Sequence, residues 1–262
     1  KRLTKNTKAI MPMHYAGGVG ALDEIYTFAN KHGLRVIEDA AHAFGTVYQG
    51  KKVGGFGDIA CFSFDGIKNI TSGEGGCIVT DDEEVLQKVR DARLLGVEKD
   101  TAKRFSGERS WDFNVIAQGW RYHMSDIMAA IGNIQLKRFP DLATKRKKIA
   151  RLYNARFSQV LGLKVLPYDY DKIVPHIYVI QLGNALDRDN IRHKLNEQGV
   201  QTGVHYQPNH LLSLYKEFNN VNLPIVDAVH TKLLSLPLHP DLVDEDIARV
   251  CNELIRCVAN IE

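Results

Sequence analysis

The sequence has few cysteines, no long apolar run and only a small excess of charge. Its 262 residues include four cysteines without C-x-x-C spacing, so we expect neither a disulfide framework nor a metal site. No stretch approaches the roughly 20 apolar residues of a transmembrane helix, and no apolar segment typical of a signal peptide follows the first residues. These features predict a cytoplasmic protein with reduced thiols and no membrane partner.

The charge balance argues against nucleic acid as a partner. The chain has 34 basic and 31 acidic residues, which gives a net charge of +3. The densest basic run, residues 145–148, has no interleaved aromatic residues and is typical of a solvated helix face. A hydrophobic content of 44% predicts a folded globular chain that is long enough for a sizeable core.

Strand and helix patterns alternate along the first half, which predicts an α/β domain with a mostly parallel sheet. A helix is expected over 21–31, where Gly33 supplies the C-terminal cap. A second helix is expected over 81–95, because two aspartates begin it. The expected strands of this half cover residues 8–13, 35–37, 59–64 and 76–80.

The second half predicts one long helix and a smaller α/β unit. The long helical pattern covers residues 125–160, and Pro140 is expected to break or kink it. We place a domain boundary near residue 160, with a large domain over 1–160 and a small domain over 161–262. The further elements expected are strands at 164–166 and 177–182 and helices at 189–198 and 244–258.

Lys68 is the first candidate for chemistry. It follows a buried strand, in a loop that contains four glycines, and Ser63 lies five residues before it. Apolar surroundings lower the pKa of a lysine, as a nucleophilic amine requires, and glycines let a backbone approach a ligand closely. A solvated surface lysine remains the alternative on spacing alone.

Asp39 ends a buried strand, and ligands in open α/β sheets bind outside the carboxyl ends of strands. A carboxylate there can pair with a protonated ring nitrogen, as pyridoxal phosphate (PLP) requires. His42 lies three residues further on and could face the same ligand. The alternatives are a helix cap for Asp39 and a satisfied buried histidine for His42.

Four segments carry a resemblance that covers nearly the whole chain. The segments EDAAHAFGT, GDIACFSF, IKNITSGEGGCIVTDDEE and MSDIMAAIGNIQLKR resemble the DegT/DnrJ/EryC1/StrS family of PLP-dependent sugar aminotransferases. The resemblance implies an aspartate aminotransferase-like (fold type I) large domain and a small α/β domain. Relatives carry on the order of a hundred residues before the segment KAIMPMHYAG, about one domain, so we expect the large domain to be N-terminally incomplete.

The resemblance implies a role for each candidate. Lys68 would hold the cofactor covalently and then move a proton, Asp39 would keep the ring nitrogen protonated, and Ser63 would bind the phosphate. His42 matches a position that lies against the cofactor ring or its phenolic oxygen.

The stretch GWRYHMSD, residues 119–126, matches a segment that reaches into the partner subunit's active site in relatives. Arg121 and His123 stand where asparagine and arginine are usual, and both can still donate to phosphate. The resemblance therefore implies a homodimer with shared active sites. His205 and His210 match a segment near the sugar site, with ordinary loop structure as the alternative.

The resemblance implies that the protein aminates a keto nucleotide-sugar, with glutamate as the amino donor. The expected substrate is a 4-keto-6-deoxy sugar, and the product would serve surface polysaccharide or glycoconjugate synthesis. Two alternative functions remain: a 3-keto-sugar aminotransferase, and a non-catalytic or regulatory protein that binds PLP. Lys68 argues against a sugar 3-dehydratase, in which histidine replaces this lysine. A dinucleotide site at residues 17–20 is disfavoured, because Asp23 stands where the third glycine is needed.

Overall fold

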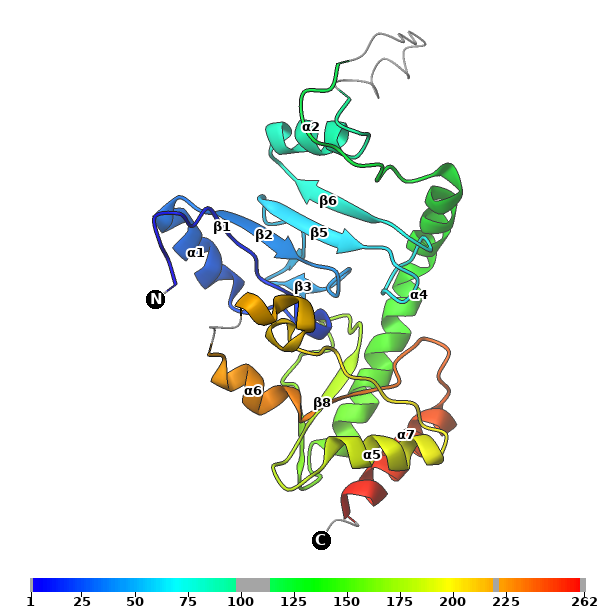
Figure 1. Cartoon of the computed structure of the whole chain (residues 1–262). Coiled ribbons are helices and arrows are strands. Elements are labelled where there is room, and N and C mark those ends of the chain that lie inside the picture. The colour runs from blue at the N-terminus through cyan, green and yellow to red at the C-terminus, as the bar shows by residue number, and fades with distance from the viewer. Residues whose placement is uncertain (1, 98–113, 219–221, 260–262) are drawn as a thin grey trace. The chain divides into compact units, whose positions relative to one another are not determined.

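The computed structural model describes residues 2–97, 114–218 and 222–259 (Figure 1). Its contacts group the chain into two compact units. Unit 1 comprises residues 1–15 and 19–139, and unit 2 comprises residues 16–18 and 140–262. A compact unit need not fold alone, so the domain boundary near residue 160 stays a prediction.

Unit 1 is built on a four-stranded sheet in the order β1-β2-β5-β6. The pairings of β1 with β2 and of β2 with β5 are parallel, whereas β6 runs antiparallel to β5. The predicted α/β class with a mostly parallel sheet is confirmed. The strands are β1 (Ala9–Ile10), β2 (Arg35–Asp39), β5 (Ile59–Ser63) and β6 (Gly76–Thr80), and a separate hairpin pairs β3 (Val47–Tyr48) with β4 (Lys51–Lys52).

The helices of unit 1 begin and end at the signals in the sequence. Helix α1 (Leu22–His32) ends at Gly33, whose φ of 63° is the left-handed cap conformation that glycine adopts easily. Helix α2 (Glu83–Ala92) begins at Asp82, whose side chain accepts from the N–H groups of Glu84 and Val85.

Helix α4 (Asp126–Phe157) continues through Pro140, so of the predicted break or kink the break does not occur. Proline removes one N–H and leaves the carbonyl four residues earlier without its helical partner. That residue is Leu136, whose side chain is 54% exposed, so solvent can satisfy the carbonyl. Ser125 caps the first turn, where its hydroxyl accepts from the N–H of Met128 at 3.3 Å.

Unit 2 holds a three-stranded antiparallel sheet in the order β7-β8-β9. Its apolar core joins β8 and β9 to α5, α7 and the C-terminal half of α4. The elements are β7 (Leu163–Val165), β8 (Tyr178–Leu182), β9 (Leu233–Leu236), α5 (Arg188–Glu197), α6 (Pro224–His230) and α7 (Asp244–Ala259), and short 3-10 turns cover Tyr15–Gly17, Asn209–Leu211 and Ser213–Phe218.

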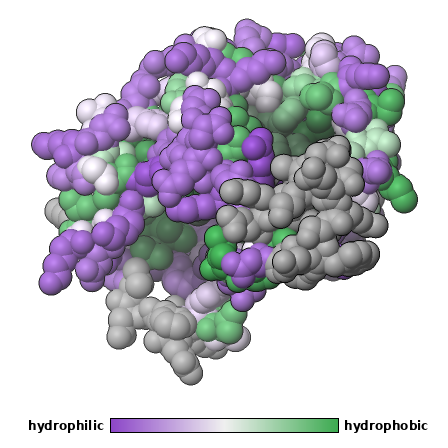
Figure 2. All heavy atoms as spheres, turned by 90° about the horizontal axis from the view of Figure 1, so that it is seen from above, coloured by the Kyte–Doolittle hydropathy of each residue, from purple (hydrophilic) through white to green (hydrophobic). Residues whose placement is uncertain are grey.

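Hydrophobic side chains reach the surface among hydrophilic ones on the face drawn in Figure 2. In unit 1, the exposed apolar residues include Ile127, Ile131 and Ile134 of α4, and Ile78 and Val79 of the edge strand β6. None of the helices in the described ranges combines the length and apolarity needed to cross a membrane.

Candidate active site

Asp39 and Ser63 lie at the same edge of the unit 1 sheet. They are the last residues of β2 and β5, which are parallel neighbours, so the carboxyl ends of both strands meet there. Asp39 pairs with Cys61, and Ser63 lies two residues further along β5. Side chains alternate along a strand, so all three share one face of the sheet. Asp39 and Ser63 therefore lie at one edge and on one face of the sheet.

The chain turns sharply after Asp39. The Asp39 carboxylate accepts from the N–H of Ala41 at 3.1 Å, and the N–H of Ala43 donates to the carbonyl of Ala40 at 2.9 Å. This turn carries His42, which is only 6% exposed, and its ring centroid lies 6.4 Å from that of Tyr15. His42 is thus buried in the loop that leaves the sheet at Asp39.

Lys68 belongs to the loop that leaves the same edge after Ser63. The N–H of Asp65 donates to the Ser63 hydroxyl at 3.3 Å, and the Asp65 carbonyl accepts from the N–H of Lys68 at 3.1 Å. The Asp65 carboxylate also accepts from the N–H of Ile67 at 3.0 Å. One turn centred on Asp65 therefore connects the hydroxyl to the lysine, whose side chain is half-buried.

Glycines let the lysine loop pack closely against the start of α4. A Cβ on Gly73 would lie 3.2 Å from the sulfur of Met128, and a Cβ on Gly75 would lie 2.7 Å from the methyl of Met124. Both glycines have positive φ, of 87° and 142°. Ser72 approaches Gly132, one helical turn beyond Met128. A side chain at Gly73 or Gly75 would require the side chain of Met128 or Met124 to shift.

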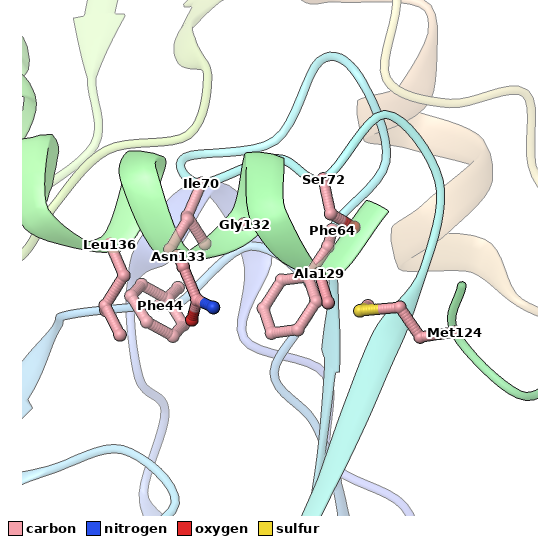
Figure 3. A pocket seen from close by; sticks show the side chains of 9 residues that line it. All are labelled: Phe44, Phe64, Ile70, Ser72, Met124, Ala129, Gly132, Asn133 and Leu136. Carbon is pink, nitrogen blue, oxygen red and sulfur yellow. The ribbon is translucent and has the colours of Figure 1, made fainter. Parts of the chain in front are cut away.

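An apolar cavity of about 220 Å³ lies between this loop and α4. Figure 3 shows the Phe44 and Phe64 rings facing the helix, and Met124 directed toward Phe64. Phe44 also meets Phe139 edge-on, with ring centroids 4.9 Å apart. The lining is Phe44, Phe64, Ile70, Ser72, Met124, Ala129, Gly132, Asn133 and Leu136.

Cys61 is a neighbour of Asp39 that the sequence analysis did not single out. Burial, and next the negative charge of Asp39, raise the pKa of its thiol, so the thiol stays protonated at neutral pH. The signal was available, because Cys61-x-Ser63 places both residues on one strand face. Met124 and Met128 were also missed, since only the folded chain brings them to the glycines.

Arg121 and His123 are exposed in a segment that pairs with the chain after α2. The N–H of Trp120 donates to the carbonyl of Ala92 at 2.7 Å, and the N–H of Tyr122 donates to the carbonyl of Arg93 at 2.9 Å. The rings of Trp120 and Tyr122 stack on each other with centroids 6.0 Å apart.

Side-chain hydrogen bonds and ion pairs do not link Arg121 or His123 to Asp39, Ser63 or Lys68 in the part of the chain that the structure describes. Arg121 and His123 are both exposed. Their roles toward phosphate stay predictions.

His205 and His210 belong to unit 2, and each has a local polar partner. His205 Nδ1 lies 2.8 Å from the hydroxyl of Ser235, and His210 Nε2 lies 2.7 Å from a carboxylate oxygen of Asp227. These contacts fit ordinary loop structure. A role in sugar binding stays a prediction for both residues.

The groups of unit 1 match the chemistry of PLP. Asp39 offers a carboxylate for a protonated ring nitrogen, Ser63 a hydroxyl for the phosphate and Lys68 a primary amine for the aldehyde. The buried ring of His42 offers a flat neighbour for an aromatic cofactor. The donor set therefore fits this cofactor.

The model of the DegT/DnrJ/EryC1/StrS aminotransferase family matches residues 1–255. The spore coat polysaccharide biosynthesis protein SpsC of Bacillus subtilis is 35% identical over 99% of this chain and 68% of its own length.

Solved structures agree with that match. PseC of Helicobacter pylori, an aminotransferase of pseudoaminic acid biosynthesis, is 30% identical, with a TM-score of 0.91 over 99% of this chain and 69% of its own. Spr1654 of Streptococcus pneumoniae in its PLP form is 28% identical, with a TM-score of 0.89 over 99% of this chain and 70% of its own.

Proposed function

Because the chain belongs to the DegT/DnrJ/EryC1/StrS aminotransferase family, we propose that it transfers the amino group of glutamate to a keto nucleotide-sugar. The products are 2-oxoglutarate and an amino sugar, in which the former carbonyl carbon bears the amino group. The observation that carries the proposal is the meeting of Asp39, Ser63 and the Lys68 loop at one sheet edge. The surface polysaccharide role follows by analogy with SpsC, and a cytoplasmic location is proposed with it.

The cofactor is PLP. When bound, it supplies the electron sink that stabilises negative charge at the carbon losing its proton. Asp39 would hold the proton on the ring nitrogen, because an opposite charge favours the protonated form. Ser63 would donate its hydroxyl proton to a phosphate oxygen while its own oxygen accepts from Asp65.

Lys68 would first bind the aldehyde carbon and later carry the proton between donor and acceptor carbons. A neutral amine is needed for both tasks, and the half-buried loop restricts its contact with water. The buried His42 would fix the orientation of the ring from the loop after Asp39. His205 and His210 are proposed as sugar neighbours.

The test of this function uses the full-length gene product with PLP, ¹⁵N-glutamate and a panel of 3-keto and 4-keto nucleotide-sugars. Mass analysis is expected to find the ¹⁵N label in the product from a 4-keto-6-deoxy sugar. Label from a 3-keto sugar instead would move the specificity to that position. Bound PLP without turnover of any sugar would favour the non-catalytic or regulatory alternative.

A homodimer with shared sites is the proposed assembly. The exposed Arg121 and His123, with the stacked Trp120 and Tyr122 beside them, offer a polar and aromatic surface to a second copy. Closed two-fold dimers would give each active site one such segment from its neighbour.

Subunit mixing tests the shared site. Lys68→Ala and the double variant Arg121→Ala/His123→Ala are each expected to be inactive alone. A mixed dimer then holds one site with both defects and one with neither, so equal mixing should restore about a quarter of wild-type activity. No recovery, with subunit exchange shown by differently tagged chains, would mean that the segment serves its own subunit.

A further inference from the structure

A buried polar cluster lies behind the candidate site, on the other face of β2. Glu38 and His14 are each 1% exposed, and His14 Nε2 lies 2.7 Å from Glu38 Oε2. Tyr26 of α1 donates its hydroxyl proton to Glu38 Oε1 at 2.9 Å. We refer to Tyr26, Glu38 and His14 as the buried triad. Nothing in the proposed chemistry uses these groups directly.

The triad is fully paired at its carboxylate. A buried carboxylate is costly unless hydrogen bonds replace its lost hydration, and here both Glu38 oxygens have a partner. Burial, followed by the hydrogen bond to Glu38, raises the pKa of Tyr26 well above its usual range. Tyr26 therefore remains a proton donor at every ordinary pH, and the cluster ties α1 to β2 and to the segment that contains His14.

That segment also holds the backbone of Asp39. The N–H of Asp39 donates to the carbonyl of Pro12 at 2.8 Å, and the N–H of His14 donates to the carbonyl of Asp39 at 3.0 Å. On the opposite side, the N–H of Ala40 donates to the carbonyl of Cys61 at 2.9 Å. The end of β2 is thus held from both sides, by β5 and by residues 12–14.

Strand β5 and residues 12–14, which flank the end of β2, differ in how firmly they are anchored. Strand β5 pairs with neighbours on both of its sides, whereas residues 12–14 lie outside the regular part of β1. Met11 and Met13 are 66% and 53% exposed, so their side chains anchor this segment weakly. The His14 ring, which points into the core and meets Glu38, is the buried anchor of the segment.

We propose that Tyr26, Glu38 and His14 are positioning residues that hold the Asp39 carboxylate where it meets the ring nitrogen of PLP. The inference rests on the proposed role of Asp39. Because Glu38 and Asp39 are consecutive in a strand, their side chains point to opposite faces. A substitution in the buried triad therefore acts on the Asp39 carboxylate through the backbone hydrogen bonds of residues 12–14. The triad itself does not contact the cofactor.

The test compares PLP with its 1-deaza analogue, in which carbon replaces the ring nitrogen, as ligands of the full-length protein. Tyr26→Phe and Glu38→Gln keep the size of the side chain and remove one partner or one charge. Each is expected to weaken PLP binding about tenfold, which is the lower end of the effect of removing a group that orients a metal ligand. Binding of the analogue is expected to stay unchanged. Tyr48→Phe is the matched control, because the Tyr48 hydroxyl donates to a carboxylate, that of Asp23, which is exposed.

Asp39→Asn serves as the reference, since it removes the charge that the ring nitrogen meets. Selective loss of PLP binding in Asp39→Asn, but not in Tyr26→Phe and Glu38→Gln, would overturn the triad inference alone. Equal loss of both ligands in the triad variants would also overturn it, because the triad would then support the fold only. Unselective behaviour of Asp39→Asn would reject the role of Asp39, and the inference with it. Thermal unfolding identifies a variant that fails to fold, and Tyr26→Phe, the milder change, then decides.

Discussion

Lys68→Ala is expected to lower the rate of transamination by about a thousandfold or more, because the general acid–base role of the lysine alone is worth roughly 10²–10⁴-fold. The variant should still bind PLP non-covalently, since Asp39 and Ser63 lie on strands that do not depend on the lysine side chain. Stopped-flow absorbance with glutamate measures the half-reaction, and dialysis with absorbance measures retained PLP.

Borohydride reduction of the PLP-loaded wild-type protein, followed by peptide mapping, provides the direct assignment. The label should fall on Lys68. Lys52→Ala is the matched control, because Lys52 is an exposed lysine of β4 in the same unit. A label on any other lysine, or normal turnover of Lys68→Ala, would reject the assignment.

Asp39→Asn is expected to lower kcat by about 10²–10³-fold, the size typical of removing one charge-stabilising group from an active site. The substitution keeps an oxygen that can accept from the N–H of Ala41, so the turn after β2 should persist. Only the negative charge opposite the ring nitrogen is lost, and the nitrogen then loses its proton more easily.

The measurement is kcat for the amination reaction, with PLP content determined on the same sample. Asp81→Asn is the control, since Asp81 is an exposed carboxylate of unit 1. Near-normal turnover of Asp39→Asn with full PLP content would mean that Asp39 serves only to cap the turn.

Most helices and the long strands could be predicted because local chemistry determines them, although α6 (Pro224–His230) was not predicted. Gly33 ends α1, Asp82 begins α2, and the run Gly76–Thr80 is strand β6 at the predicted bounds. The pairing direction of β6 could not be read from the sequence, because it depends on how the loop 64–75 turns back. Strand β9 was not predicted at all, because its residues Leu233–Leu236 have no period that distinguishes a strand from a helix.

The predicted break at Pro140 is absent for a different reason. Proline lowers helix stability, but the part of α4 after Pro140 packs into the core of unit 2 through Ile149, Tyr153 and Phe157. Tertiary contacts of this kind override a local preference.

The candidate site was predictable only in part. Asp39 and Ser63 could be placed at one edge, because the ends of parallel strands share it. The buried partners could not be placed, because His14 and Glu38 are 24 positions apart and meet only after β2 packs on its neighbours. The contacts of Met124 and Met128 likewise depend on the path of the lysine loop.

The glycines of that loop have a consequence for how sequences of this kind are interpreted. Glycine is favoured at positions 73 and 75 because the positive φ angles strain other residues and the side chains of Met128 and Met124 lie close to any added Cβ. That requirement concerns the shape of the loop and is indifferent to the sugar that enters the site. We therefore expect the SGEGG pattern to identify enzymes of this architecture whatever their acceptor, so it has no diagnostic value for substrate choice. Discrimination between acceptors should be sought outside this loop, as at His205 and His210, the proposed sugar neighbours.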